Sequence, residues 1–436
     1  MTPGLETDGT VTAVGSRRLK ARPRPAPWLW WLIGITAVAS AVIISRRPDA
    51  FTNAQFYAED GTRWFSDAYN MGPWQALFVS YAGHFLLQPR LVALVATPFG
   101  IANAPLIYNL FGLGFQVAPI LFFMSGRCRP LLPSLWYRGV LSAVYLLMPS
   151  TEVNVNIASA QWHLVILATL VLLAPPSPRW WWRAFDVATV ALCALTGACV
   201  FVLAPIGLLW WWLRRWRWSA VLTAILVAGI AAQVYAMTLA PRTACGLGAS
   251  LHELILIICD RIVLAGLFAE EGHTHVFVTG LPHATLIAAG ICLLSLPVVV
   301  FAALRAPWEL RVFGLAGLGI AAAGLAVPLV SATGDQWEII LGGRAGERYF
   351  LMAQVAWVVT VLWAAGQLPR PWLRGAGWVV TAAAFASGLV AAWQYPAFVN
   401  YDWPQEAHTI ASAAPGTHLS LPINPGPPWT VIVTAK

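Results

Sequence analysis

The sequence predicts an all-α polytopic membrane protein with about 11 transmembrane helices, in a range of about 10–13, and a large outward first loop that contains interfacial helices. Apolar residues make up 59% of the 436 residues and charged residues only 10%, whereas soluble domains have about 25% charged residues. The chain has 24 tryptophans, many of them near the ends of apolar runs, where an indole ring fits the headgroup layer. A soluble globular domain is excluded by this composition.

The N-terminal residues 1–27 are polar and predict a disordered cytoplasmic tail. The first apolar run follows at Trp28–Ser45, and a long tail before it favours an uncleaved signal anchor over a signal peptide cleaved near Ala39-Ser40-Ala41. Residues 28–394 form the predicted transmembrane domain. Its later apolar runs lie near 104–124, 136–150, 161–175, 184–196, 198–213, 219–239, 281–304, 310–330, 349–366 and 376–394.

The basic residues predict the orientation. With the tail inside, 17 of the 26 Lys and Arg residues fall on the cytoplasmic side, and 14 of the 18 acidic residues fall outside. This split requires the apolar stretch 85–101, which contains Arg90 and two prolines, to be an interfacial or re-entrant helix and not a further span. We therefore expect a cytoplasmic N-terminus and an outward C-terminus in a bacterial plasma membrane.

The long outward segments hold most of the acidic residues and histidines: 46–103, 240–280, 331–348 and the tail 395–436. In the tail, His418–Ile423 and Trp429–Val433 resemble strands, so we expect a small hairpin or cap there. Cys245 and Cys259 share one outward loop, where a disulfide and two separate thiols are both open. Any chemistry is expected on the outer side.

The first loop carries adjacent carboxylates, Glu59 and Asp60, about 15 residues after the first run. Such a pair suits proton transfer from a substrate hydroxyl. The alternative is an acidic cap, in which Asp60 or Thr62 starts the amphipathic stretch that follows.

The loop before the tenth run carries Arg344, Arg348 and Tyr349 beside several glycines. Two guanidinium groups near a membrane surface suit a phosphate, because guanidinium binds oxyanions in a fork. A plain surface ion pair between Arg348 and Glu347, or a lipid-headgroup contact, is the alternative.

Further candidates for substrate binding come from polar residues at the outer ends of spans, where polar groups are costly unless paired or wet. They are Asn156, Gln161, Trp162 and His163, with His84 and Arg90 in the first loop. Ordinary loop and interface chemistry is the alternative for all six. Glu270, Glu271, His273 and His275 are close enough in sequence to bind a divalent metal, but we predict no metal site and no required cofactor.

The cytoplasmic N-terminus, the first span and the large acidic first loop resemble the GT-C superfamily of polytopic membrane glycosyltransferases. The resemblance covers nearly the whole chain in architecture, and at residue level it rests on Glu59-Asp60. It implies a polyprenyl-phosphate-linked sugar as donor, an outward-facing cell-envelope glycan or lipid as acceptor, and a loop carboxylate as base, for which Asp60 is the better candidate. The chain departs from the large oligosaccharyltransferase members, because no extended soluble C-terminal domain follows the last run.

Two other functions remain open: a transporter or lipid flippase, and a non-catalytic assembly partner for envelope polysaccharide synthesis. No convincing internal repeat of the kind many transporters have is visible, and the ionisable groups gather at one face. Nucleic acid is not an expected partner, since the basic residues are scattered among apolar runs. Membrane lipids, the lipid-linked sugar and the acceptor are the expected partners.

Overall fold

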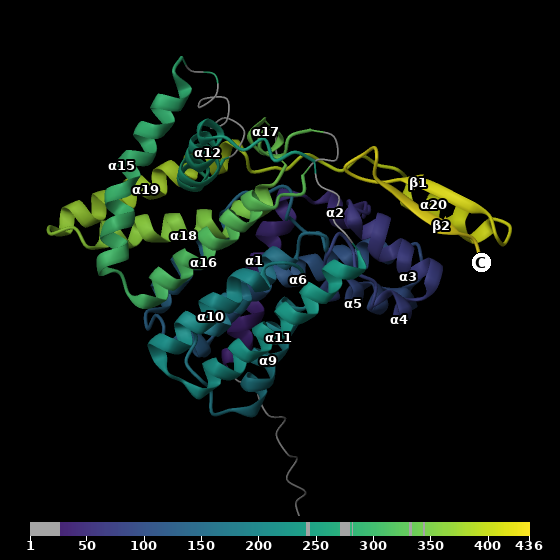
Figure 1. The fold of residues 1–436 in the computed structure, drawn as a ribbon, viewed down its shortest axis with the longest axis horizontal. Coiled ribbons are helices and arrows are strands. Elements are labelled where there is room, and N and C mark those ends of the chain that lie inside the picture. The colour runs from purple at the N-terminus through teal and green to yellow at the C-terminus, as the bar shows by residue number, and fades with distance from the viewer. Residues whose placement is uncertain (1–26, 241–244, 271–279, 281, 331–333, 343–344) are drawn as a thin grey trace, which may run out of the picture.

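The computed structural model describes residues 27–240, 245–270, 280, 282–330, 334–342 and 345–436 (Figure 1). Within these ranges nearly all regular structure is helical, and one two-stranded sheet lies near the C-terminus. The predicted all-α architecture is confirmed at this level.

Each predicted apolar run coincides with a helix. These helices are α1 (Pro27–Arg46), α6 (Ala104–Met124), α7 (Leu135–Leu147), α8 (Gln161–Leu173), α9 (Trp180–Ala194), α10 (Val200–Arg214), α11 (Arg217–Leu239), α15 (Ala284–Arg305), α16 (Trp308–Ala326), α18 (Glu347–Gly366) and α19 (Pro371–Ala391).

Seven helices in the described part of the chain are long and apolar enough to cross a membrane, namely α1, α6, α11, α15, α16, α18 and α19. The helices α7, α8, α9 and α10 have 13 to 15 residues and reach only about 20–23 Å, against a hydrocarbon layer of about 30 Å. The structure thus has seven helices of spanning length, consistent with a multi-pass membrane protein, and the count of about 11 spans stays a prediction.

The short helix α8 lies at the centre of the main hydrophobic core. Ten of its 13 residues are buried, from His163 to Leu173, and they pack with residues of α6, α9, α10, α16 and α18. Because other helices surround it, its apolar surface needs no lipid contact. Its first residues, Gln161 to His163, are therefore held rigidly at the end of the core.

The first loop folds into short helices: α2 (Asp49–Thr52), the π-helical turn η1 (Asp60–Phe65), α3 (Ser66–Met71), α4 (Pro73–Ala76), α5 (Leu87–Ala96) and the 3₁₀ turn η2 (Thr97–Phe99). The ten residues of α5 reach about 15 Å, too short to cross. The side chains of Trp74, Phe78 and Phe99 are mostly exposed, as expected of helices that lie along a membrane surface.

The predicted outward loop 240–280 contains a helical stretch formed by α12 (Leu251–Ile257), the π-helical turn η4 (Ile258–Leu264) and α13 (Ala265–Phe268). Arg261 in this stretch donates from Nη2 to the Ile340 carbonyl of α17 (Gln336–Gly342) at 2.7 Å. Asp260 and Arg261 interrupt the apolar run, which hides the stretch from hydropathy. All six cysteines, each within the described residues, are free thiols, so Cys245 and Cys259 form no disulfide.

The C-terminal segment forms α20 (Trp403–Ser412) and an antiparallel hairpin of β1 (His418–Pro422) and β2 (Thr430–Thr434). This is the predicted hairpin. Figure 1 shows the segment beside α3, and β2 contacts both α3 and η1. Trp403, Ile423 and Val431 share a buried cluster with Phe56 and Trp64 of the first loop, so the end of the chain helps to hold the loop that carries the acidic pair.

The arginines and acidic residues assigned to the cytoplasmic side meet in ion pairs at helix ends. Arg127, in the 3₁₀ turn η3 (Gly126–Cys128), pairs with Asp186 at 2.9 Å, and Arg214 pairs with Glu309. By contrast, the end of α1 lies against the C-terminal segment, since Tyr395 N donates to the Arg46 carbonyl at 2.8 Å. The groups predicted to share a side of the membrane are therefore together in space.

Candidate functional site

The acidic pair sits where the first loop meets the loop before α8. Asp60 begins η1, and no side-chain hydrogen bond caps this turn among the described residues. Its carboxylate instead accepts from the Ile157 N–H at 3.1 Å. The helix-cap alternative is therefore wrong for Asp60, whose carboxylate joins two loops that are 97 residues apart.

The two carboxylates differ in access. Asp60 is only 1% exposed, whereas Glu59 is partly exposed. Burial raises the pKa of Asp60 well above its usual value, the Ile157 and Ala158 backbone N–H groups oppose the shift, and the Glu59 carboxylate adds to it. Burial favours the neutral acid at Asp60, and a neutral, covered carboxyl is a poor base.

Glu59 faces a cation as well as solvent. Burial raises the pKa of Glu59, and the Arg348 guanidinium, the largest opposing influence, lowers it together with Arg63. Glu59 is thus a partly exposed carboxylate whose pKa is raised mainly by burial and held down in part by Arg348. Glu59 is therefore the more accessible of the two carboxylates, whereas the sequence favoured Asp60 as the base.

Arg348 is already engaged within the protein. Its Nη1 forms an ion pair with the Glu152 carboxylate, and its Nη2 donates to the Leu329 carbonyl at 2.6 Å and to the Tyr349 hydroxyl at 3.2 Å. The pair is partly buried, with side chains 22% and 11% exposed for Arg348 and Glu152. These bonds use part of the five N–H donors of the guanidinium, so a phosphate must share Arg348 with Glu152.

The alternative of a surface ion pair between Arg348 and Glu347 is wrong, because Arg348 pairs with Glu152 and Glu347 has other partners. Its carboxylate accepts from the Thr151 hydroxyl at 3.0 Å and from the Glu152 N–H at 3.2 Å. The first turn of α18 therefore holds the loop before α8 through both Glu347 and Arg348.

Two residues that sequence reasoning did not select border the same region. Burial raises the pKa of Tyr57 to about 12, with the Arg47 guanidinium opposing the shift and Glu347 adding to it. The Arg47 guanidinium lies 4.4 Å from the centre of the Phe398 ring and donates to the Thr151 carbonyl at 3.5 Å. The sequence did offer one indication of Arg47: it lies on the predicted outer side of the first span, where basic residues are less common than on the inner side.

Two of the four candidates at the start of α8 and in the loop before it, Asn156 and His163, have internal partners. Asn156 donates to the Glu152 carbonyl at 2.8 Å. His163 bonds through Nδ1 to the Tyr145 hydroxyl at 2.7 Å and through Nε2 to the Val153 carbonyl at 3.0 Å. These contacts shape the loop that presents Glu152, so they support the site without needing a substrate.

Gln161 and Trp162 differ from these two. The Gln161 Oε1 and Trp162 Nε1 atoms are buried with no hydrogen-bond partner among the described residues. The Trp162 ring packs edge-on against Tyr349 at a centroid distance of 5.4 Å. Trp162 therefore lies beside the Arg348 region, with a polar atom left for a ligand or water.

The first-loop candidates lie beside the acidic pair but form their own contacts. Arg90 is buried, pairs with Asp67 at 2.7 Å and lies 4.8 Å over the Trp64 ring. His84 exchanges backbone hydrogen bonds with Tyr81. Arg90 thus stabilises the first loop through Asp67 and Trp64, and its ion pair is with Asp67 and not with Glu59 or Asp60.

Some predicted residues lie outside the described ranges: Arg344, Glu271, His273 and His275. Glu270 is described and buried. Within the described residues, no group of three or more His, Cys, Asp or Glu side chains is arranged to hold a metal ion.

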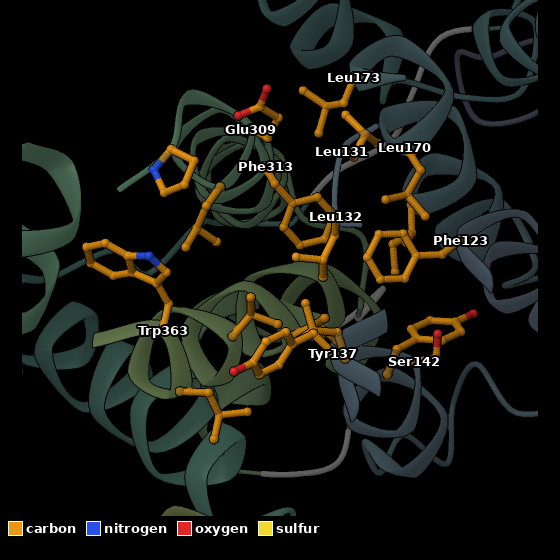
Figure 2. Close-up of a pocket in the computed structure, with 18 of the residues that line it drawn as sticks. Phe123, Leu131, Leu132, Tyr137, Ser142, Leu170, Leu173, Glu309, Phe313 and Trp363 are labelled. Carbon is orange, nitrogen blue, oxygen red and sulfur yellow. The ribbon is translucent and has the colours of Figure 1, made fainter. Parts of the chain in front are cut away.

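A cavity of about 410 Å³ lies elsewhere, among α6, α7, α8, α16, α18 and α19 (Figure 2). Its lining includes Glu309 and Gln367, which are near the ends predicted to be cytoplasmic. The acidic pair and this cavity are therefore separate features.

Comparisons of the chain with protein-family models, with curated proteins and with solved structures found no match. The arrangement of side chains is thus the basis for a functional assignment. It offers a partly exposed carboxylate, Glu59, near a guanidinium, Arg348, with the Trp162 indole packed against the neighbouring Tyr349.

Proposed function

We propose that the protein is an integral membrane glycosyltransferase of the GT-C type. It moves a sugar from a polyprenyl-phosphate donor to a glycan or lipid acceptor of the cell envelope, on the outer face of a bacterial plasma membrane. The observation that carries the proposal is the partly exposed Glu59 carboxylate near Arg348. Burial raises the pKa of Glu59, and the Arg348 guanidinium opposes this rise. A base needs access to its substrate, which the partial exposure of Glu59 provides.

In the proposed reaction the acceptor hydroxyl gives its proton to the Glu59 carboxylate. The hydroxyl oxygen attacks the anomeric carbon from the face opposite the phosphate, and the bond from that carbon to the phosphate oxygen breaks. Polyprenyl phosphate leaves with the bonding electron pair, and the configuration at the anomeric carbon inverts. A single base suffices because the phosphate leaves as a stable anion.

Arg348 is the group that we expect to stabilise the departing phosphate. Glu152 holds Arg348 at the outer end of α18, and a phosphate that arrives there shares the guanidinium with Glu152. Asp60 holds Ile157, so it acts as a positioning residue between the first loop and the loop before α8. Arg344 remains a proposed second phosphate ligand on sequence grounds alone.

The direct test uses the full chain in liposomes with synthetic polyprenyl-phosphate sugars and envelope glycan as acceptor. We expect sugar transfer, greatly reduced in Glu59→Gln and unchanged in Glu338→Gln, whose exposed carboxylate lies on α17. Glycan analysis of a deletion strain that carries each variant gives the matching result in cells. Movement of labelled lipid between leaflets without transfer favours a flippase, and neither activity favours an assembly partner.

A further inference from the structure

The apolar cavity of Figure 2 is a chamber built by helices of the membrane domain. Phe123, Leu132, Leu170, Phe313 and Trp363 point into it from different elements (Figure 2). Four of the helices that line it, α6, α16, α18 and α19, have the length and hydropathy to cross a membrane. Helices of membrane-spanning length thus form most of the wall of the chamber.

The chamber lies further along α18 than Arg348, which is in the first turn of this helix. Its lining on α18 runs from Val355 to Gly366. At 1.5 Å per residue, these two residues lie about 10 Å and about 27 Å from Arg348 along the helix. The chamber therefore occupies the half of the domain that the charge distribution places toward the cytoplasm.

The walls indicate what fills the chamber. A large unfilled cavity with apolar walls is costly, because its lining loses packing contacts. The membrane around these helices supplies hydrocarbon chains, which match such walls. Glu309 is the one carboxylate in the lining of this cavity, and its charge is paired with Arg214.

The rim indicates the charge of the molecule whose chain enters. Pro307 and Gln367 line the chamber and are exposed at its end. Arg305 precedes Pro307 by two residues and Arg370 follows Gln367 by three, and both are exposed. Two exposed arginines within three residues of the apolar lining complement a phosphate attached to a hydrocarbon chain.

We propose that the chamber binds one hydrocarbon chain of an anionic phospholipid from the leaflet on the Arg305–Arg370 side, with the lipid phosphate at the rim. This lipid is separate from the proposed sugar donor, whose phosphate belongs at the opposite end of α18. The inference does not depend on the glycosyltransferase proposal.

The test is native mass spectrometry of the full chain, released from nanodiscs that contain equal amounts of phosphatidylglycerol and phosphatidylcholine. The wild-type chain should retain a phosphatidylglycerol adduct. Leu170→Trp should lose it by filling the chamber, and Leu132→Trp, in the loop that lines it, should do the same if the helix variant fails to fold. Leu315→Trp is the matched control, because Leu315 is exposed on α16 and does not line the chamber.

The rim is tested by Arg305→Gln combined with Arg370→Gln. This variant should keep a phospholipid adduct but lose the preference for phosphatidylglycerol, while Arg217→Gln, an exposed arginine on α11, should keep the preference. Equal adducts in wild type and in a folded chamber-filling variant would overturn the proposal. Retention of polyprenyl phosphate in place of phospholipid, or the absence of any adduct from wild type, would also overturn it.

Discussion

Arg348 forms an ion pair with Glu152, and this pair joins the first turn of α18 to the loop that precedes α8. The Arg348 N–H also donates to a Glu152 carboxylate oxygen at 3.1 Å. The link spans 196 residues of sequence and lies beside the carboxylate that we propose as base. Access to the guanidinium is thus set by a protein carboxylate before any substrate arrives.

Substitutions of Glu59 and of Asp60 should have different effects on the rate of sugar transfer. Glu59→Gln removes the reachable base, so transfer should fall by about 10²–10⁴-fold with little change in donor affinity. Asp60→Asn keeps a carbonyl oxygen that can accept from the Ile157 N–H, so most activity should remain. Steady-state assays in liposomes measure both, and loss of activity in Asp60→Asn with full activity in Glu59→Gln would return the role of base to Asp60.

The pH dependence follows from the environment of Glu59. Burial raises the pKa of Glu59 above its usual value near 4.5, and a base acts only when ionised, so the transfer rate should rise with pH through this raised pKa. Stability should have the opposite pH dependence. Between the unfolded and folded pKa values of Glu59, the folded chain binds more protons than the unfolded chain. The contribution of Glu59 to the free energy of unfolding should therefore fall as pH rises. Rate and thermal-melting profiles over the same pH range check both signs.

Removal of the Arg348 charge should move the rate profile further. The guanidinium lowers the pKa of Glu59, so Arg348→Met should shift the rise of the transfer rate to higher pH. Arg348→Lys keeps the positive charge and should leave this rise at nearly the same pH. Arg348→Lys loses the fork, and it should therefore raise the apparent KM for the lipid-linked sugar. A rise that stays at the same pH in Arg348→Met would show that the two groups do not interact.

The ion pair between Arg348 and Glu152 should also contribute to the stability of the fold. Glu152→Gln leaves a partly buried guanidinium without its counter-charge, so the free energy of unfolding should fall by about 1–3 kcal/mol. A double-mutant cycle with Arg348→Met, measured by unfolding in mixed micelles, should give a coupling energy of the same sign. Additive losses would mean that the pair contributes nothing beyond its separate residues.

The helices were largely predictable from the sequence because apolar runs report burial locally. Trp28–Ser45 and 349–366, for example, coincide with α1 and α18. The strand-like patterns near His418 and Thr430 likewise match the hairpin. The chamber-lining surfaces were not predictable, because a residue that faces a chamber and a residue that faces lipid are both simply apolar.

The site was predictable only in part. Adjacent carboxylates in an outward loop drew attention to Glu59 and Asp60, but which of them is covered depends on Ile157, 97 residues away. The ion pair of Glu152 with Arg348 is a tertiary contact that sequence spacing does not encode. Arg90 resembled a ligand-binding arginine and instead pairs with Asp67.

The orientation predicts the outcome of reporter fusions. A phosphatase that is active only outside the cytoplasm should be active when fused after Lys436 and inactive when inserted at Arg215, between α10 and α11. The physical reason is the inward bias of 17 of 26 basic residues. The reverse pattern of activity would invert the topology and place Glu59 in the cytoplasm, where a lipid-linked donor has no special advantage over a nucleotide sugar.

The C-terminal hairpin should be required for the geometry of the acidic pair, and Gly61 offers a way to test this. A Cβ added to Gly61 would lie 2.7 Å from Ile423 Cδ1 and 2.8 Å from Val431 Cγ2. The Asn424 N–H and carbonyl also bond the Phe56 carbonyl and the Ala58 N–H at 3.2 and 2.7 Å. The segment thus packs tightly against both sides of the loop that carries Glu59.

Gly61→Ala should therefore destabilise the contact by about 1–3 kcal/mol through overpacking. We expect faster proteolysis of residues 395–436 and slower transfer at unchanged membrane insertion. Val431→Ala in the same chain removes one of the two clashing methyl groups and should restore part of both properties, whereas Gly34→Ala, with nothing within 4 Å of the added Cβ, should change neither. If Gly61→Ala leaves transfer and protease resistance at wild-type levels, the hairpin does not position the acidic pair, and its packing against the first loop serves stability elsewhere.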